Sequence, residues 1–167
     1  LSLWDTFRTV HPLFNLIAKE EQRDMLVSLV EMSKHGGSLP RWPSGYGYSN
    51  SMLGSPVDMV ITESYLKGIR NFDVNLAYTK MRRVALESIP KDSSAAGREE
   101  IDGYLTYGYC PTEFGDEAVS KTLEYAWADH SISLLAKELH RPEDQALFER
   151  HSKFYKNVWN PDTQYFQ

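Results

Sequence analysis

The sequence predicts an all-α protein built from antiparallel helical hairpins. Apolar residues recur at three- and four-residue steps along most of the chain, as they do on the buried face of a helix. The connections between successive periodic segments are alternately very short and very long. Strand-like alternation of polar and apolar residues is almost absent, and only a weak alternation over residues 104–109 predicts a short extended piece.

Local start and stop signals support the individual helices. Pro12 predicts a break or kink in the first helix, and the pair Gly36-Gly37 is typical of a helix C-terminus. Ser55-Pro56 predicts a start, with Ser as the N-cap and Pro at the first helical position. The expected helices cover about residues 5–18, 21–35, 55–69, 73–90, 117–140 and 142–159.

The six helices group into three hairpins within one domain over residues 1–167, because helices joined by short turns are antiparallel neighbours. Two long irregular segments, residues 38–54 and 89–116, separate the hairpins and are candidates for function. Three hairpins fit a solenoid of helical repeats or half of an (α/α)6 toroid, a ring of six hairpins. No repeat at a fixed period is found. In both architectures the functional face lies where the long loops gather.

Composition excludes several classes of function. The formal net charge is −5 without a basic cluster, so nucleic acid is not an expected partner. The chain lacks 18 consecutive apolar residues, so no membrane span is expected. Cys110 is the only cysteine and is expected to be a buried, inert thiol. The N-terminus has neither an initiator Met nor the pattern of a signal peptide, so we expect the chain to begin inside a longer protein or after processing.

Two aromatic clusters are candidates for binding. In the first, Asp5 can accept hydrogen bonds from sugar hydroxyls while Trp4 covers an apolar ring face. The alternative is that Asp5 caps the first helix and pairs with Arg8. In the second, Arg41 and Trp42 lie between two prolines in a glycine-rich loop. The alternative there is a well-packed loop with aromatic plugs.

The acidic residues do not form a recognisable catalytic pair. Glu124 and Asp129 are five residues apart on one predicted helix and do not share a face well, and Glu63 is isolated. Inverting glycoside hydrolysis needs two carboxyl groups about 6.5–9.5 Å apart. The five histidines show no spacing typical of metal ligands. We therefore assign no catalytic and no metal-binding residue to this chain.

Several distinctive stretches are spread in order along the chain: residues 4–8 with 11–12, 36–42, 67–69 with 72–73 and 77–78, 119–126, and 135–137. Taken together, these stretches resemble glycoside hydrolase family 92, the calcium-dependent exo-acting α-mannosidases. In this family two adjacent Asp and a Trp often follow a Glu-Tyr-Ala triplet, whereas this chain has Ala128 and His130 there. Glu63 stands where Asp is more usual, so the resemblance assigns no role to Glu63 or Asp129.

The resemblance implies that residues 1–167 form the N-terminal half of an (α/α)6 catalytic domain. It implies inverting hydrolysis of terminal α-linked mannose, with α-1,2 as the first candidate linkage. The general acid Glu, the general base Asp and the Ca²⁺ ligands belong to motifs such as Glu-Gly-Asn that are absent here. By resemblance, this chain contributes substrate contacts through Trp4 and Asp5, with Arg41 and Trp42 in the same rim.

Three further expectations follow from the resemblance. The isolated chain should have no mannosidase activity, and the remainder of the same catalytic domain is its expected partner. Apolar faces should remain at the two open ends of the half-ring and favour self-association. An extracytoplasmic location is expected from the family alone. The alternatives are another inverting (α/α)6 glycoside hydrolase, and a non-enzymatic helical-repeat module that binds peptide.

Overall fold

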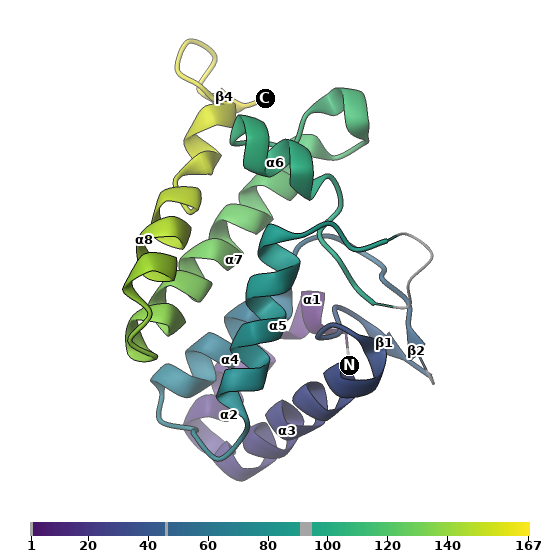
Figure 1. The fold of residues 1–167 in the computed structure, drawn as a ribbon, viewed down its shortest axis with the longest axis vertical. Helices are drawn as coiled ribbons and strands as arrows, with labels where there is room; N and C mark the ends of the chain where they lie inside the picture. The colour runs from purple at the N-terminus through teal and green to yellow at the C-terminus, as the bar shows by residue number, and fades with distance from the viewer. Residues whose placement is uncertain (1, 46, 91–94) are drawn as a thin grey trace.

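The computed structural model describes residues 2–45, 47–90 and 95–167, and it confirms the all-α hairpin fold (Figure 1). Strands within this part of the chain are limited to two-residue pairs, β1 with β2 and β3 with β4. The elements are α1 Leu3–Thr6, α2 Val10–Ile17, α3 Lys19–Gly36, β1 Pro43–Ser44, β2 Gly47–Tyr48, α4 Pro56–Leu66, α5 Val74–Leu86, α6 Ile101–Tyr107, η1 Thr112–Phe114, α7 Ala118–Glu138, α8 Pro142–His151, η2 Phe154–Val158, β3 Trp159–Asn160 and β4 Tyr165–Phe166.

The helices pack in two rows. Helix α4 contacts α2 on one side and α7 on the other, which makes one row. Helix α3 packs against α2 and α5, and α8 runs back along the length of α7 (Figure 1). The first helices of the three hairpins therefore form one row, α3 and α8 pack beside α2 and α7, and α5 packs against α7 and α3.

The main core lies where the two rows meet. Helix α4 is buried over most of its length, and α7 contributes a long buried face. Burying one such aliphatic side chain contributes roughly 1.5–3 kcal/mol relative to leaving it in water. Residues that are at most 1% exposed include Leu26 of α3, Ile61 of α4, Met81 of α5 and Leu135 of α7. This core fixes the starting points of α4 and α7, where the long loops arrive.

The first predicted helix is divided into two. Helix α1 ends at Thr6, Thr9 has a non-helical backbone, and α2 begins at Val10. Pro12 therefore falls in the first turn of α2, where its missing N–H group has no helical partner to lose. The predicted interruption of this helix is found at residues 7–9 and not at Pro12, which lies inside α2. It separates the short helix that carries Trp4 from the packed body of the first hairpin.

The extended piece predicted over residues 104–109 is wrong. Residues 101–107 form α6, which ends at Gly108 in the left-handed conformation (φ 77°). The seven-residue helix buries Ile101 and Tyr104, three residues apart, as a helical face requires. A helix of two turns is too short to reveal its period against a strand pattern. The predicted last helix likewise ends early, at His151, and continues as η2.

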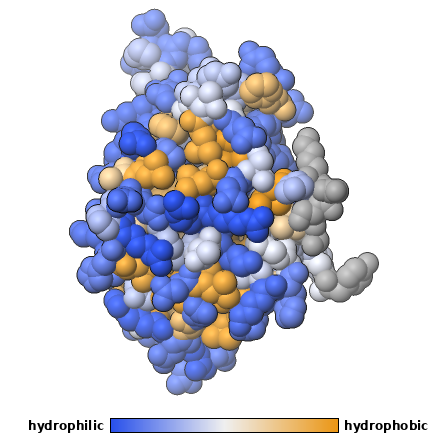
Figure 2. Space-filling view, viewed as in Figure 1, coloured by the Kyte–Doolittle hydropathy of each residue, from blue (hydrophilic) through white to orange (hydrophobic). Residues whose placement is uncertain are grey.

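Large apolar side chains remain exposed on α2 and α7. On α2, Leu13, Leu16 and Ile17 are 48%, 66% and 72% exposed, and on α7 Trp127 is 47% exposed. The face shown in Figure 2 is mostly hydrophilic, with separate apolar patches between the charged groups. In the part of the chain that the structure describes, no helix combines the length and the hydropathy needed to cross a membrane.

Candidate substrate-contact site

The two long loops meet at a single buried arginine. Arg41 is 4% exposed, and its guanidinium donates hydrogen bonds to the carbonyl oxygens of Asn50 (3.2 Å), Met52 (2.5 Å) and Gly97 (2.5 Å). Burial lowers the pKa of Arg41 from its usual range. Because the first two carbonyls lie in the first loop and the third in the second, Arg41 joins the loops through their backbones.

A rim with access to solvent is formed by α1. Asp5 is exposed and Trp4 is half-buried, so both members of the predicted pair can be reached from outside. The Asp5 carboxylate accepts a hydrogen bond from the Ser2 hydroxyl. The indole Nε1 of Trp4 is buried and has no hydrogen-bond partner among the described residues. Asp5 and Trp4 therefore both keep some access to solvent on the same short helix.

An ion pair anchors this rim to α7. Arg8 donates to Glu124 over 2.9 Å, so its carboxylate partner lies 116 residues away rather than at Asp5. The Arg8 guanidinium lies 4.4 Å from the ring centroid of Phe7, 5.3 Å from that of Trp4 and 5.7 Å from that of Trp127. Such cation–π contacts contribute about 0.5–1 kcal/mol each when exposed. The α1–α2 turn is therefore held against α7.

The end of the first loop packs against the same carboxylate. Gly54 has φ +74°, and a Cβ atom there would lie 2.9 Å from Oε2 of Glu124. Only glycine combines this backbone conformation with this close approach. Glu124 therefore lies between the rim and the loop that leads into α4.

Arg41 and Trp42 lie in the first long loop, whereas the rim is formed by α1. Trp42 is half-buried, and its carbonyl accepts from the backbone N–H of Ser49 over 3.1 Å. Among the described residues, no hydrogen bond or ring contact joins Trp42 to Trp4. Of the four predicted contact residues, Trp4 and Asp5 form the rim, whereas Arg41 is occupied by backbone carbonyls. A substrate role for Arg41 and Trp42 stays a prediction.

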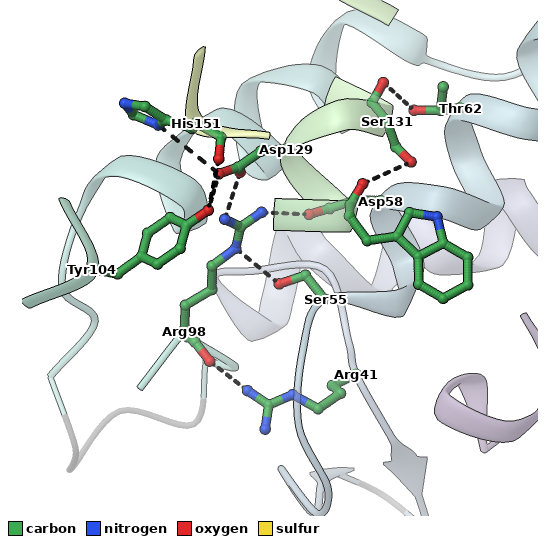
Figure 3. Close-up of polar contacts among 11 residues, drawn as sticks. Arg41, Ser55, Asp58, Thr62, Arg98, Tyr104, Asp129, Ser131 and His151 are labelled. Atoms are coloured by element: carbon green, nitrogen blue, oxygen red, sulfur yellow. Dashed lines mark hydrogen bonds and ion pairs between the residues drawn. The ribbon is translucent and has the colours of Figure 1, made fainter. Parts of the chain in front are cut away.

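A buried ion cluster lies behind the loops (Figure 3). The Arg98 guanidinium donates to Asp129 over 2.6 Å, to Asp58 over 3.2 Å and to the Ser55 hydroxyl over 3.3 Å. The hydroxyl of Tyr104 donates to the second oxygen of Asp129 over 2.9 Å. The side chains of Arg98, Asp58 and Asp129 are 0–2% exposed. The cluster therefore ties the second loop to α4, α6 and α7.

Burial governs the protonation of this cluster. It raises the pKa of Asp58 to about 7, against the opposing effect of Arg98. Burial also lowers the pKa of His151, whose Nδ1 lies 3.9 Å from Asp129. For Arg98 itself, burial lowers the pKa but Asp129 and Asp58 outweigh it, so the net shift is upward. The Arg98 guanidinium therefore stays charged, and its ion pairs hold the second loop against α4 and α7.

Sequence reasoning missed Asp58 and Arg98. They are 40 residues apart, and no local motif contains both. The available signal was Asp58 itself, a charged residue inside a helix that is otherwise almost entirely buried. The prediction that Glu124 and Asp129 do not share a face is confirmed, because Glu124 meets Arg8 near the surface and Asp129 is fully buried.

The remaining candidate groups have structural partners. Cys110 is 2% exposed, and burial raises the pKa of its thiol to about 11, which confirms an inert thiol. Glu63 pairs with Lys67 over 2.6 Å on the surface of α4. In the described ranges, no group of three His, Cys, Asp or Glu side chains is placed to hold a metal ion.

A cavity of about 650 Å³ opens between the two loops. Arg41 and Arg98 lie in its wall, together with acidic side chains from the start of α6 and the exposed ring of Phe114. Its volume lies within the range of pockets for small molecules.

The hairpin fold, with its aromatic and acidic rim beside two clamped loops, defines a helical domain of the kind found in carbohydrate-active enzymes. The chain belongs to glycosyl hydrolase family 92: the profile of the family's catalytic domain matches residues 1–167. The fold and the family therefore agree over the whole chain.

Similar proteins point in the same direction. A protein of Arthroderma benhamiae described as an uncharacterized secreted glycosidase is 30% identical, over 87% of this chain and 20% of its own length. The structure of a family GH92 inverting mannosidase of Bacteroides thetaiotaomicron has a TM-score of 0.93 and 29% identity, covering 99% of this chain and 22% of that one. A family GH92 α-mannosidase of the same species, in complex with mannoimidazole, has a TM-score of 0.90 and 31% identity, covering 99% and 21%. The chain spans about a fifth of the length of these relatives.

Proposed function

We propose that this chain is the N-terminal part of the catalytic domain of an α-mannosidase, and that it supplies one wall of the substrate site. The single observation that carries the proposal is the solvent-accessible Trp4–Asp5 rim in a chain of this family. The names of the similar structures, which are mannosidases, support it. The proposed reaction is hydrolysis of terminal α-linked mannose with inversion, with α-1,2-linked mannose as the first substrate to test.

In the proposed mechanism this chain binds and orients the sugar. Asp5 accepts hydrogen bonds from ring hydroxyls, which are stronger to a carboxylate than to a neutral acceptor. The ring of Trp4 covers the apolar face of the sugar, and the Arg8–Glu124 pair holds α1 in place. Arg41 holds the first loop in place by donating hydrogen bonds to its backbone carbonyls. A Glu acid and an Asp base from the remainder of the domain would protonate the leaving oxygen and activate water.

Calcium belongs to the proposal for the whole enzyme only. Calcium prefers six to eight oxygen ligands. The described residues offer no cluster of three acidic or histidine side chains for a metal ion, so they do not fit a complete calcium site. We place the calcium ligands outside this chain and assign no step here to the ion.

The proposed partner is the remainder of the same catalytic domain. Leu16 and Ile17 on α2 and Trp127 on α7 are large apolar side chains that remain exposed. Further helices of an (α/α)6 toroid would cover such faces. Without them we expect the isolated chain to self-associate. The name of the fungal relative, a secreted glycosidase, supports an extracytoplasmic location for the whole protein.

The test compares the whole enzyme with residues 1–167 alone on α-1,2-mannobiose in the presence of Ca²⁺. We expect the whole enzyme to release β-mannose, observed by NMR, and to lose activity with a chelator. The isolated chain should show no turnover. Turnover by the isolated chain, or cleavage of α-glucosides instead of α-mannosides, would contradict the proposal and favour another helical glycoside hydrolase.

A further inference from the structure

Helix α2 has the reverse of the usual amphipathic arrangement, with polar side chains on its inner face. The helix lies against α3 and α4 (Figure 1). Its buried side chains are those of His11 and Asn15, which are 0% and 1% exposed and stand one turn apart. The apolar side chains of Leu16 and Ile17, on the same helix, are 66% and 72% exposed. The inner face of α2 therefore gains less from apolar burial than the core helices do, and it depends on polar contacts.

The polar contacts of this face form a chain of hydrogen bonds through three helices. The amide Nε2 of Gln22 on α3 donates to the hydroxyl of Ser64 on α4 over 2.9 Å. The other amide atom of Gln22, Oε1, is an acceptor and lies 2.9 Å from Nδ1 of His11. Nδ1 therefore carries a proton, because two acceptors do not form a hydrogen bond. In the neutral imidazole the unprotonated nitrogen is then Nε2.

The closed arrangement of the three helices gives Nε2 of His11 no partner for a proton. This atom is buried and has no hydrogen-bond partner among the described residues, and the same holds for both amide atoms of Asn15. A proton on Nε2 would create a charged donor that is neither solvated nor paired, which costs far more than a neutral unpaired group. Packing of α2 against α3 and α4 therefore excludes the imidazolium form.

The charged groups around His11 do not offset this cost. Helix α4 carries Glu63, which pairs with Lys67 over 2.6 Å on the surface, and Asp58, which is held in the buried ion cluster. Burial lowers the pKa of His11 and outweighs its hydrogen bond and the charge of Glu63, which both raise it. The first turns of α3 carry three exposed charged side chains and one ion pair of 2.6 Å, namely Lys19, Glu20 and Glu21, and Arg23 with Asp24.

We propose that α2 is a pH-sensitive segment, which opens away from α3 and α4 when His11 takes up a proton. The open state binds this proton and the closed state does not, so acid shifts the equilibrium toward the open state. The closed state is fully favoured above the ordinary histidine pKa of about 6.5, and it loses this advantage as the pH falls below that value. Helix α1 directly precedes α2 and carries Trp4, so opening also loosens the rim. The device belongs to the fold and does not depend on the substrate.

The test follows hydrogen–deuterium exchange of the whole protein by mass spectrometry at about pH 7.5 and about pH 5.5. After correction for the intrinsic exchange rate, protection of residues 10–17 should fall about tenfold at the lower pH, because the open state binds one proton about one pH unit below its pKa. Peptides from α4 are the internal reference and should keep their protection. His11→Asn keeps a donor near the position of Nδ1 but takes up no proton, so it should abolish the fall. The matched control is His35→Asn, at an exposed position on α3, which should retain the tenfold fall.

A second measurement covers the case in which His11→Asn leaves α2 open at both pH values. The slow exchange of the imidazole C2 proton, read from the wild-type peptides, reports the pKa of His11 itself. A pKa well below about 6.5, together with the tenfold loss of protection, supports the proposal. A His11 that titrates near 6.5 while residues 10–17 stay protected would overturn it. An equal loss of protection in the wild type and in His11→Asn would overturn it as well.

Discussion

The exposed rim and the buried ion cluster contain the same residue types, arginine and aspartate, in opposite environments. At the rim, Asp5 is open to solvent and Arg8 is shared between Glu124 and three aromatic rings. In the cluster, Arg98 and Asp129 are fully buried and fully paired. A carboxylate with a free face can bind a ligand, whereas a carboxylate held by a buried guanidinium can only hold the fold. Burial and pairing therefore distinguish a binding residue from a scaffold residue better than charge does.

The largest effect should come from breaking the cluster. Arg98→Met leaves Asp129 buried without its cation, which should lower the free energy of unfolding by about 3–5 kcal/mol. The measurement is urea denaturation at neutral pH. Arg83→Met, at an exposed pair with Glu87, is the control and should cost at most about 1 kcal/mol. Equal losses in the two variants would show that the cluster does not clamp the loops.

The second effect should appear at the rim and only in function. Asp5→Asn in the whole enzyme should lower kcat/KM about tenfold to a hundredfold, because hydrogen bonds from the sugar would lose their charged acceptor. The free energy of unfolding should change by less than about 0.5 kcal/mol, since Asp5 is exposed. Asp24→Asn, at another exposed position, should alter neither quantity. A loss of stability without a loss of activity would show that Asp5 supports the fold and does not bind substrate.

The third effect concerns the dependence of stability on pH. Asp58 has a pKa of about 7 when folded, against 3.8 as the ordinary value, so between these values the folded protein holds a proton that the unfolded chain releases. This contribution is fully present below about pH 4 and is lost as the pH rises through about 7. Relative to Asp58→Asn, the wild type should therefore lose stability from about pH 4 to 7, measured by urea denaturation. A difference that stays constant over this range would contradict the raised pKa.

Local signals made most of the fold predictable. Long amphipathic segments gave the hairpin helices, because their period repeats several times and Ser55-Pro56 and Gly36-Gly37 mark their ends. Helix α6 was missed because two turns do not establish a period. The length of the periodic segment, rather than the stability of the helix, therefore determined whether the helix could be predicted from the sequence.

The candidate site was predictable only where its residues are neighbours in the chain. Trp4 and Asp5 stand side by side, so their pairing is visible without a structure. Glu124 meets Arg8 across 116 residues, and Arg98 meets Asp58 across 40. Such pairings arise from helix packing, which a single sequence does not reveal.

The way in which Arg41 joins the loops affects how the protein can change during evolution. Its guanidinium holds carbonyl groups, which every amino acid carries, and not particular side chains. The residues that follow one another along either loop can therefore be exchanged while the path of the backbone is retained. A lineage can therefore change the side chains of either loop without having to rebuild the frame that holds them.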